Sequence, residues 1–197
     1  FGLTEPDAGS DAGGTKTRAR LDEAAGEWVI DGEKAFITNS GTPITSIVTI
    51  TALTGPGEIS TIVVPAGTPG FEVQPAYRKM GWHASDTHGL TFVECRVPED
   101  HLLGPRGRGF AQFLEILDEG RIAIAALAVG VIQRCVEDAV AYANERQTFG
   151  RTIGPNQAVA FRCADMQVQL AAARRLVYHA AWLHDRGRPY KNEAAVA

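Results

Sequence analysis

FAQFLEILDEGRIAIAALAVGVIQRCVEDAVAYANER, residues 110–146, is the stretch that decides the fold class. It contains no proline, and apolar residues recur every three or four positions, beginning with Phe113, Leu114 and Leu117. This spacing is the period of an amphipathic helix, so we predict one helix over the whole stretch. Its many Ala and Gly residues carry little side-chain bulk, which suits close contact with neighbouring helices and indicates a bundle.

A second helix is predicted after a loop at Phe149–Pro155. It should begin near Asn156 and end near Gly187, because glycine is common just past a helix C-terminus and Pro189 lies beyond. The C-terminal half is therefore expected to contain two antiparallel helices.

The residues before Leu103 have a different pattern, with short runs rich in Val, Ile, Thr and Phe between Gly, Pro, Asp and Asn. The clearest hairpin is predicted between Glu27–Ile30 and Glu33–Thr38, with Asp31-Gly32 as a type I′ turn. Further strands are predicted at Thr15–Leu21, Ser46–Leu53, Ile59–Pro65, Phe71–Gln74 and Leu90–Val97. So many strands can close into a small barrel or sandwich.

The predicted fold class is thus α+β, with two domains. Residues 1–104 form a small closed β-barrel or sandwich domain, and residues 105–197 form long antiparallel helices of a four-helix-bundle type. The chain has no initiator Met and stops inside an alanine-rich run at Ala197, so we expect an internal piece of a longer protein.

Composition excludes several classes of protein. A net charge of −4 with interspersed signs provides no basic stripe for nucleic acid. The most apolar run, Ile122–Ile132, is much shorter than the roughly 20 residues of a membrane span. Three widely spaced cysteines without a Cys-x-x-Cys pair indicate reduced thiols and no zinc site. We expect a protein of the bacterial cytoplasm in preference to the mitochondrial matrix.

The first 14 residues form a turn-rich segment with many free N–H groups, which can cradle an anion. Glycine allows close approach of the main chain, and the hydroxyls of Thr4 and Ser10 add donors. Taken alone, however, a loop of this composition is more often a solvated turn.

The order Thr-Glu-Pro-x-Ala-Gly-Ser-Asp, residues 4–11, resembles the opening of the middle β-domain of acyl-CoA dehydrogenases. In that family the threonine matching Thr4 hydrogen-bonds the flavin pyrimidine edge. The serine matching Ser10 lies where FAD phosphate and acyl-CoA both pass. Donors at the pyrimidine edge stabilise the negative charge that accompanies reduction.

Phe36-Ile37-Thr38-Asn39 is similar to the family's Trp-Ile-Thr-Asn strand, with phenylalanine where tryptophan is common. The resemblance implies that the aromatic ring packs on the flavin and that the Thr38 hydroxyl points at flavin N5. Without the resemblance, Phe-Ile-Thr is an ordinary strand.

Residues 80–98 look like the family's Met-Gly…Ser-x-Thr…Phe-x-x-Val-x-Val-Pro ending of the same β-domain. His83 and His88 lie here, but no Cys or carboxylate stands at ligand spacing, so a surface or pocket-lining role is preferred to metal binding. His179 and His184 are five residues apart and do not share one helix face well.

Two segments of the helical half extend the resemblance. Asp118 and Arg121 stand where family members contact the thioester ligand, although charged residues within a helix usually face water. Glu145–Gly150 with Gln157 resembles the Glu-Arg-x-x-Phe-Gly…Gln signature through which one subunit reaches its neighbour's FAD. The guanidinium of Arg146 suits a diphosphate. At least a dimer is implied, either a homodimer or a homotetramer.

The residues implied to bind FAD are Phe1, Leu3, Thr4, Gly9, Ser10, Phe36, Ile37, Thr38, Arg146, Thr148, Phe149 and Gln157. Those implied to bind acyl-CoA are Ser10, Asp118 and Arg121. No metal site is expected.

The reaction implied is the α,β-dehydrogenation of an acyl-CoA thioester, as in fatty-acid β-oxidation. A glutamate removes the α-proton while the β-hydrogen leaves as hydride to flavin N5, and electrons pass to an electron-transferring flavoprotein. In most members that glutamate lies downstream, here beyond Ala197, so no catalytic base is expected in this chain. A minority carry it immediately before the arginine matching Arg121, where this sequence has Gly120. Glu119 is rotated from that position by about 100° and is not expected to act as the base.

Two alternatives remain open from sequence. One is an acyl-CoA oxidase or related flavin monooxygenase of the same fold. The other is a non-catalytic flavin- or CoA-binding scaffold.

Overall fold

The computed structural model describes residues 1–197, which divide into two compact units, Phe1–Leu114 and Glu115–Ala197. The first unit contains β1 (Arg18–Asp22), β2 (Glu27–Thr38), β3 (Ile47–Gly55), β4 (Glu58–Pro65), β5 (Phe71–Val73), β6 (Thr87–Pro98) and two short 3-10 turns, Ala12–Gly14 and Glu99–His101. Helix α1 (Gly109–Glu145) begins there and continues into the second unit, which also holds β7 (Gln147–Thr148), β8 (Arg151–Thr152), α2 (Gln157–Asp185) and α3 (Lys191–Val196). The α+β class predicted from sequence is confirmed.

The six strands of the first unit form one sheet in the order β4-β3-β1-β2-β6-β5. All neighbours are antiparallel except β1 and β3. The sheet is open, so the prediction of closure is wrong in this respect. Leu102 and Leu103 lie along the outer edge of β4, and the Leu103 N–H donates to Thr61 O at 2.9 Å. The three-residue β5 at the other edge of the sheet does not pair with β4, so the sheet does not close.

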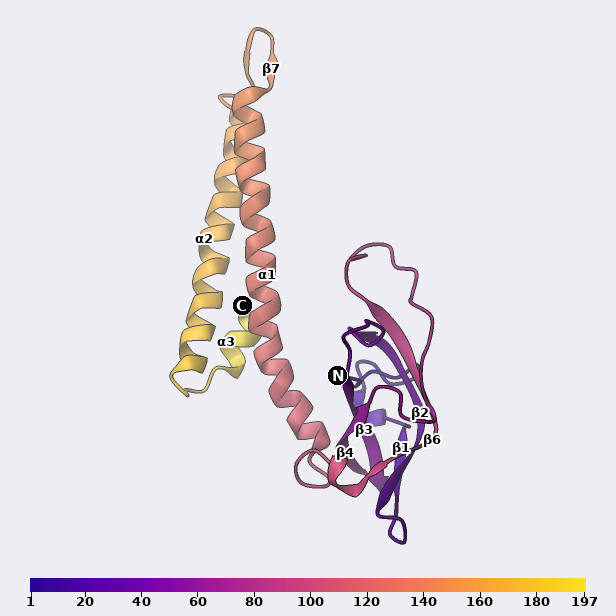
Figure 1. Cartoon of the computed structure of the whole chain (residues 1–197). Helices are drawn as coiled ribbons and strands as arrows, with labels where there is room; N and C mark the ends of the chain where they lie inside the picture. The colour runs from indigo at the N-terminus through magenta and orange to yellow at the C-terminus, as the bar shows by residue number, and fades with distance from the viewer. The chain divides into compact units, whose positions relative to one another are not determined.

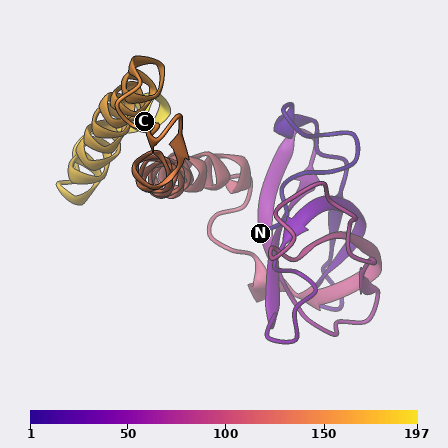
Figure 2. The same cartoon turned by 90° about the horizontal axis from the view of Figure 1, so that it is seen from above.

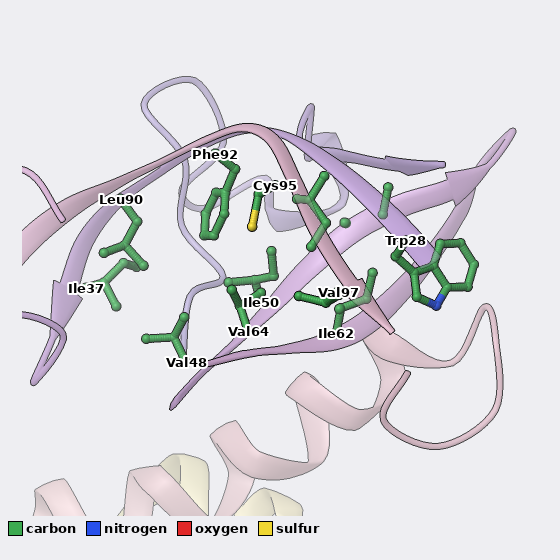
Figure 3. Packing of buried hydrophobic residues seen from close by; sticks show 13 residues of the cluster. Trp28, Ile37, Val48, Ile50, Ile62, Val64, Leu90, Phe92, Cys95 and Val97 are labelled. Carbon is green, nitrogen blue, oxygen red and sulfur yellow. The ribbon is translucent and has the colours of Figure 1, made fainter. Parts of the chain in front are cut away.

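The buried apolar side chains of this unit form one cluster. They gather on the inward-facing side of the strands, where apolar residues alternate with outward-facing polar ones. Figure 3 shows these side chains converging, among them Trp28, Ile50 and Phe92, each at most 2% exposed.

The predicted hairpin at Asp31-Gly32 is wrong. Strand β2 runs unbroken from Glu27 to Thr38, and the hairpin is formed by β1 and β2 with its turn at residues 23–26, where Gly26 has φ +67°. Asp31 and Gly32 form a bulge opposite β6 instead. A Cβ on Gly32 would lie 2.6 Å from Thr17 Cα, so close packing of two main chains requires the glycine.

In the second unit, α1 and α2 lie side by side, as Figures 1 and 2 both show. Val129 and Val136 of α1 pack with Leu170 and Val177 of α2. Both predicted helices are confirmed to within one or two residues at their ends. Helix α2 stops before Gly187, which has φ +61° and whose N–H donates to His184 O at 2.9 Å. No helix of the chain has both the length and the apolar character needed to cross a membrane.

Candidate functional site

The N-terminal segment lies between strands β2 and β3. Gly2 N–H donates to Thr49 O at 2.7 Å, and Thr51 N–H donates to Gly2 O at 3.1 Å. On the other side, Ala35 N–H donates to Thr4 O at 2.8 Å. These bonds place the main chain of Thr4 beside the part of β2 that carries Phe36.

Phe36 lies in a second bulge of β2. The pairing with β6 shifts between Lys34 and Ile37, and Phe36 has φ +59°, a conformation that bulky residues rarely adopt. Bulges of this kind redirect a side chain. Here the ring turns outward, 64% exposed, and lies 4.9 Å from the Tyr77 ring between centroids.

The next residues alternate again. Ile37 is 3% exposed and its side chain belongs to the core in Figure 3, so only its main chain is available at the surface. Thr38 is exposed and follows Ala35 by three residues, roughly 10 Å along an extended strand. We call the surface formed by Thr4, Phe36 and Thr38 the Phe36 edge. Thr4 and Phe36 thus lie on neighbouring segments, and Thr38 lies further along the strand that carries Phe36.

The other predicted residues of this unit lie before and after Thr4 in the sequence. Phe1 is 54% exposed and its ring meets the edge of Phe113 at 5.0 Å between centroids. Leu3 is half-buried, with its carbonyl accepting from Lys34 Nζ at 3.3 Å. Gly9 and Ser10 are exposed in the turn after Ala8, and no side-chain hydrogen bond holds the Ser10 hydroxyl in this structure.

Two buried charged residues, Glu5 and Lys34, were missed by sequence reasoning. Lys34 Nζ donates to Glu5 Oε1 at 2.7 Å, and their side chains are 0% and 3% exposed. Glu5 also accepts from Thr15 Oγ1, from Lys16 N–H at 2.6 Å and from Thr17 N–H at 3.1 Å. The carboxylate thus closes the loop formed by residues 5–17.

Burial of Glu5 works against ionisation, but hydrogen bonds from Lys34, Thr15 and the Lys16 N–H outweigh it and lower its pKa from 4.5 to about 2. Burial lowers the pKa of Lys34, and the hydrogen bond to Glu5 opposes that change. Glu5 is therefore a carboxylate at neutral pH.

The end of β2 is anchored by Asp86 and His88. Asp86 accepts from Gly41 N–H at 2.8 Å and lies 2.6 Å from His88 Nε2, while His88 Nδ1 lies 2.6 Å from Gln74 O. Partial burial lowers the pKa of His88, but its bonds to Gln74 O and Asp86 outweigh burial and raise it above 6.5. Both ring nitrogens of His88 thus have polar partners, whereas His83 is exposed.

On α1, Asp118 and Arg121 bind each other through an ion pair. Asp118 is largely buried and Arg121 is 45% exposed at its side chain. Glu119 points elsewhere and lies 3.5 Å from His184 Nε2 of α2. The two predicted substrate residues are therefore brought together, apart from Glu119.

The predicted inter-subunit residues cluster at one end of the helix pair. Phe149 and Gly150 have φ +54° and +75° and form the tip of the two-residue hairpin between β7 and β8, visible at the end of α1 in Figure 1. Arg146, Thr148 and Gln157 are exposed around it, and the Phe149 ring is 104% exposed. The Phe149 ring therefore does not pack against its own unit.

Comparison with known proteins gives consistent matches over the chain. The model of the acyl-CoA dehydrogenase middle domain matches residues 1–95, and that of the acyl-CoA dehydrogenase C-terminal domain matches residues 107–197. An acyl-CoA dehydrogenase of Bacillus subtilis is 45% identical over 201 residues, covering 100% of this chain and 52% of that protein.

The solved structures of similar fold include the two described next. Butyryl-CoA dehydrogenase from Megasphaera elsdenii has a TM-score of 0.95 and 39% identity, covering 100% of this chain and 52% of that one. An acyl-CoA dehydrogenase from Bacillus anthracis complexed with FAD has a TM-score of 0.88 and 35% identity, covering 92% of this chain and 31% of that one. The chain spans about half the length of the curated relatives it matches.

Proposed function

Because the chain belongs to the acyl-CoA dehydrogenase family, we propose that the whole protein containing it binds FAD and dehydrogenates an acyl-CoA thioester to the trans-2-enoyl-CoA. The FAD complex of the Bacillus anthracis relative supports the cofactor. Electron-transferring flavoprotein is the proposed electron acceptor. FAD, when bound, supplies the two-electron acceptor chemistry that no amino-acid side chain provides.

The observation that carries this proposal is the conformation of Phe36. A left-handed backbone costs a residue of this kind ~1–2 kcal/mol, and strain of this sort gathers at ligand sites. The strain here directs an aromatic ring outward, 64% exposed. The ring suits the flat face of an isoalloxazine, and the hydroxyls of Thr4 and Thr38 would supply hydrogen-bond donors to it. The residues present therefore fit the cofactor.

The remaining roles divide between two proposed domains. Residues 1–104 act as the middle β-domain, where Ser10 would contact phosphate and acyl-CoA. Residues 105–197 belong to a helical domain that contributes to oligomerisation. In the oligomer Arg146, Thr148, Phe149 and Gln157 would contact the FAD of a neighbouring subunit. The outward-facing Phe149 supports this assignment.

Substrate binding on α1 is proposed for Asp118 and Arg121. Their ion pair fixes the direction of the guanidinium, which is the donor available to a thioester ligand. Gly120 has no side chain, and Glu119 is turned toward His184, so we assign the catalytic base to a glutamate outside this chain.

The test uses the purified full-length protein. It should be yellow, and anaerobic addition of an acyl-CoA from a panel of chain lengths should bleach the flavin absorbance. Thr38→Val, which removes the hydroxyl and keeps the shape, should retain FAD and slow the bleaching. A protein that stays colourless in the presence of added FAD would refute the proposal.

Two other outcomes would change the assignment. Flavin that is bleached and then rapidly reoxidised by air would indicate an acyl-CoA oxidase or a related flavin monooxygenase. Flavin that binds but is bleached by no acyl-CoA would indicate a non-catalytic scaffold.

A further inference from the structure

The Glu5–Lys34 pair is buried beside the segment that carries Thr4, and it is fully hydrogen-bonded. Besides Glu5, the ammonium of Lys34 contacts Leu3 O at 3.3 Å, Thr51 Oγ1 at 3.1 Å and Thr15 Oγ1 at 3.4 Å. No buried side-chain N or O atom of the chain lacks a hydrogen-bond partner. The pair is thus a closed polar network inside an otherwise apolar unit.

Stability alone is a weak reason for such a pair. Removing two charges from water costs more than their attraction returns in many proteins, and apolar residues of similar volume often stabilise the fold equally well. Buried polar networks do specify one arrangement of the chain, because each member has few alternative partners. The arrangement that this network specifies is the course of the N-terminal segment along β2.

The network holds the residues on either side of Thr4, namely Leu3 through its carbonyl and Glu5 through its carboxylate. Lys34 holds the carbonyl of Leu3, and the next residue of β2, Ala35, holds the carbonyl of Thr4. Phe36 then follows at the bulge. One short piece of β2 therefore fixes both the segment that carries Thr4 and the aromatic ring.

We propose that Lys34 and Glu5 are positioning residues for the flavin: they hold Thr4 in place relative to Phe36 and Thr38, so that the hydrogen-bond donors and the ring meet the cofactor in one fixed geometry. This inference rests on the proposed function. Neither residue touches the cofactor itself. Their effect is to orient in advance the groups that do, which is worth most where donors must face developing charge.

The test compares variants of the full-length protein. Lys34→Met removes the ammonium and replaces it with an unbranched apolar side chain of similar length. The double variant Glu5→Gln with Lys34→Met removes both charges, and the glutamine oxygen remains as an acceptor for Lys16 N–H and Thr17 N–H. Thr51→Val is a milder change, since it removes one acceptor of Lys34 and leaves the pair intact.

The matched control is Lys16→Met. Lys16 belongs to the same loop and forms an ion pair with Asp7 at 2.8 Å, but both side chains are about 70% exposed (71% and 68%). Exposed pairs of this kind contribute little, so Lys16→Met should behave as wild type in every measurement.

Three quantities are measured: the dissociation constant of FAD, the midpoint potential of the bound flavin, and the amide exchange rate of Ala35 in the apoprotein. Lys34→Met should weaken FAD binding about tenfold. Its flavin potential should be about 30 mV more negative, a tenfold change for a two-electron couple, because displaced donors no longer favour the negatively charged reduced form. Ala35 should exchange faster, because its bond to Thr4 O opens more often.

The double variant separates positioning from stability. Its unfolding free energy should lie closer to that of wild type than the unfolding free energy of Lys34→Met does. Its FAD binding should nevertheless stay weakened and its flavin potential shifted. Thr51→Val should shift both in the same direction by a smaller amount. If Lys34→Met does not fold, these two variants decide the question.

The inference would be overturned if the folded double variant bound FAD as tightly as wild type does and had the same flavin midpoint potential. The proposed function would then still stand. Equal effects in Lys16→Met would overturn it as well. A wild-type protein that takes up no FAD would overturn both.

Discussion

Replacing Phe36 by glycine and by alanine separates the backbone strain at this position from the contacts of its ring. Both substitutions remove the ring. The glycine variant additionally relieves the left-handed conformation at φ +59°, whereas alanine retains a Cβ and therefore keeps most of the strain.

The magnitudes follow from the structure. The ring is 64% exposed, so about a third of the ~1.5–3 kcal/mol for burying a phenylalanine applies. The contact with Tyr77 adds ~0.5–1.5 kcal/mol. Phe36→Ala should therefore cost about 1–2.5 kcal/mol of unfolding free energy. Glycine gains ~1–2 kcal/mol from relieved strain and loses ~0.5–1 kcal/mol through the entropy of the unfolded chain. Phe36→Gly should thus be more stable than Phe36→Ala, by about 0.75 kcal/mol at the middle of these ranges and by at most about 1.5 kcal/mol.

The assay is urea unfolding of the full-length apoprotein, in which the midpoint and slope give the free energy. Thr38 provides the matched control, since it is exposed in the same strand and its φ is not positive. There the order should reverse, with Thr38→Gly less stable than Thr38→Ala. If glycine is the less stable choice at both positions, Phe36 does not occupy the left-handed region, and the argument from strain to a ligand site fails.

Three further outcomes are expected. The folded-state pKa of Glu5 is about 2 against an ordinary 4.5, so its stabilising effect is complete above pH 4.5 and lost as the pH falls toward 2; urea unfolding across that range should show a loss that Glu5→Gln lacks. Phe149→Gly should leave the unfolding midpoint unchanged or raise it, because the ring is fully exposed and φ is +54°. It should weaken FAD retention in the assembled protein, as measured by gel filtration with absorbance detection. Gly130→Ala on α1 should raise the unfolding free energy by ~0.5–1 kcal/mol, since a Cβ there meets no atom within 4 Å; a lowered melting temperature would instead show that another helix packs against this face.

Elements with a clear period could be predicted from sequence. Both long helices and all six strands of the sheet were located, because a 3.6-residue repeat, a two-residue repeat and a C-terminal glycine such as Gly187 are local signals. Local signals failed at Asp31-Gly32. The dipeptide is typical of a type I′ turn, but the approach of Thr17 to Gly32 is a contact between different strands, which the sequence does not display.

The candidate site was foreseen only in part, for the same reason. Thr4, Phe36 and Thr38 were identified through resemblance, and the structure brings their segments together. Ile37 was expected to bind the cofactor, and its side chain is instead in the core. The Glu5–Lys34 pair joins residues 29 positions apart. A lysine within a strand reads as an outward-facing polar residue until its partner is known.

The bulge in β2 has a consequence for chain length. Between Lys34 and Ile37 strand β2 advances three residues while β6 advances two, from Leu90 to His88. Deleting Ala35 would restore a regular ladder and leave the inward and outward faces of the neighbouring residues unchanged, but it would remove the left-handed bulge that sets the direction of the Phe36 ring. We therefore expect the sheet to tolerate this deletion and the site to lose the geometry of Phe36.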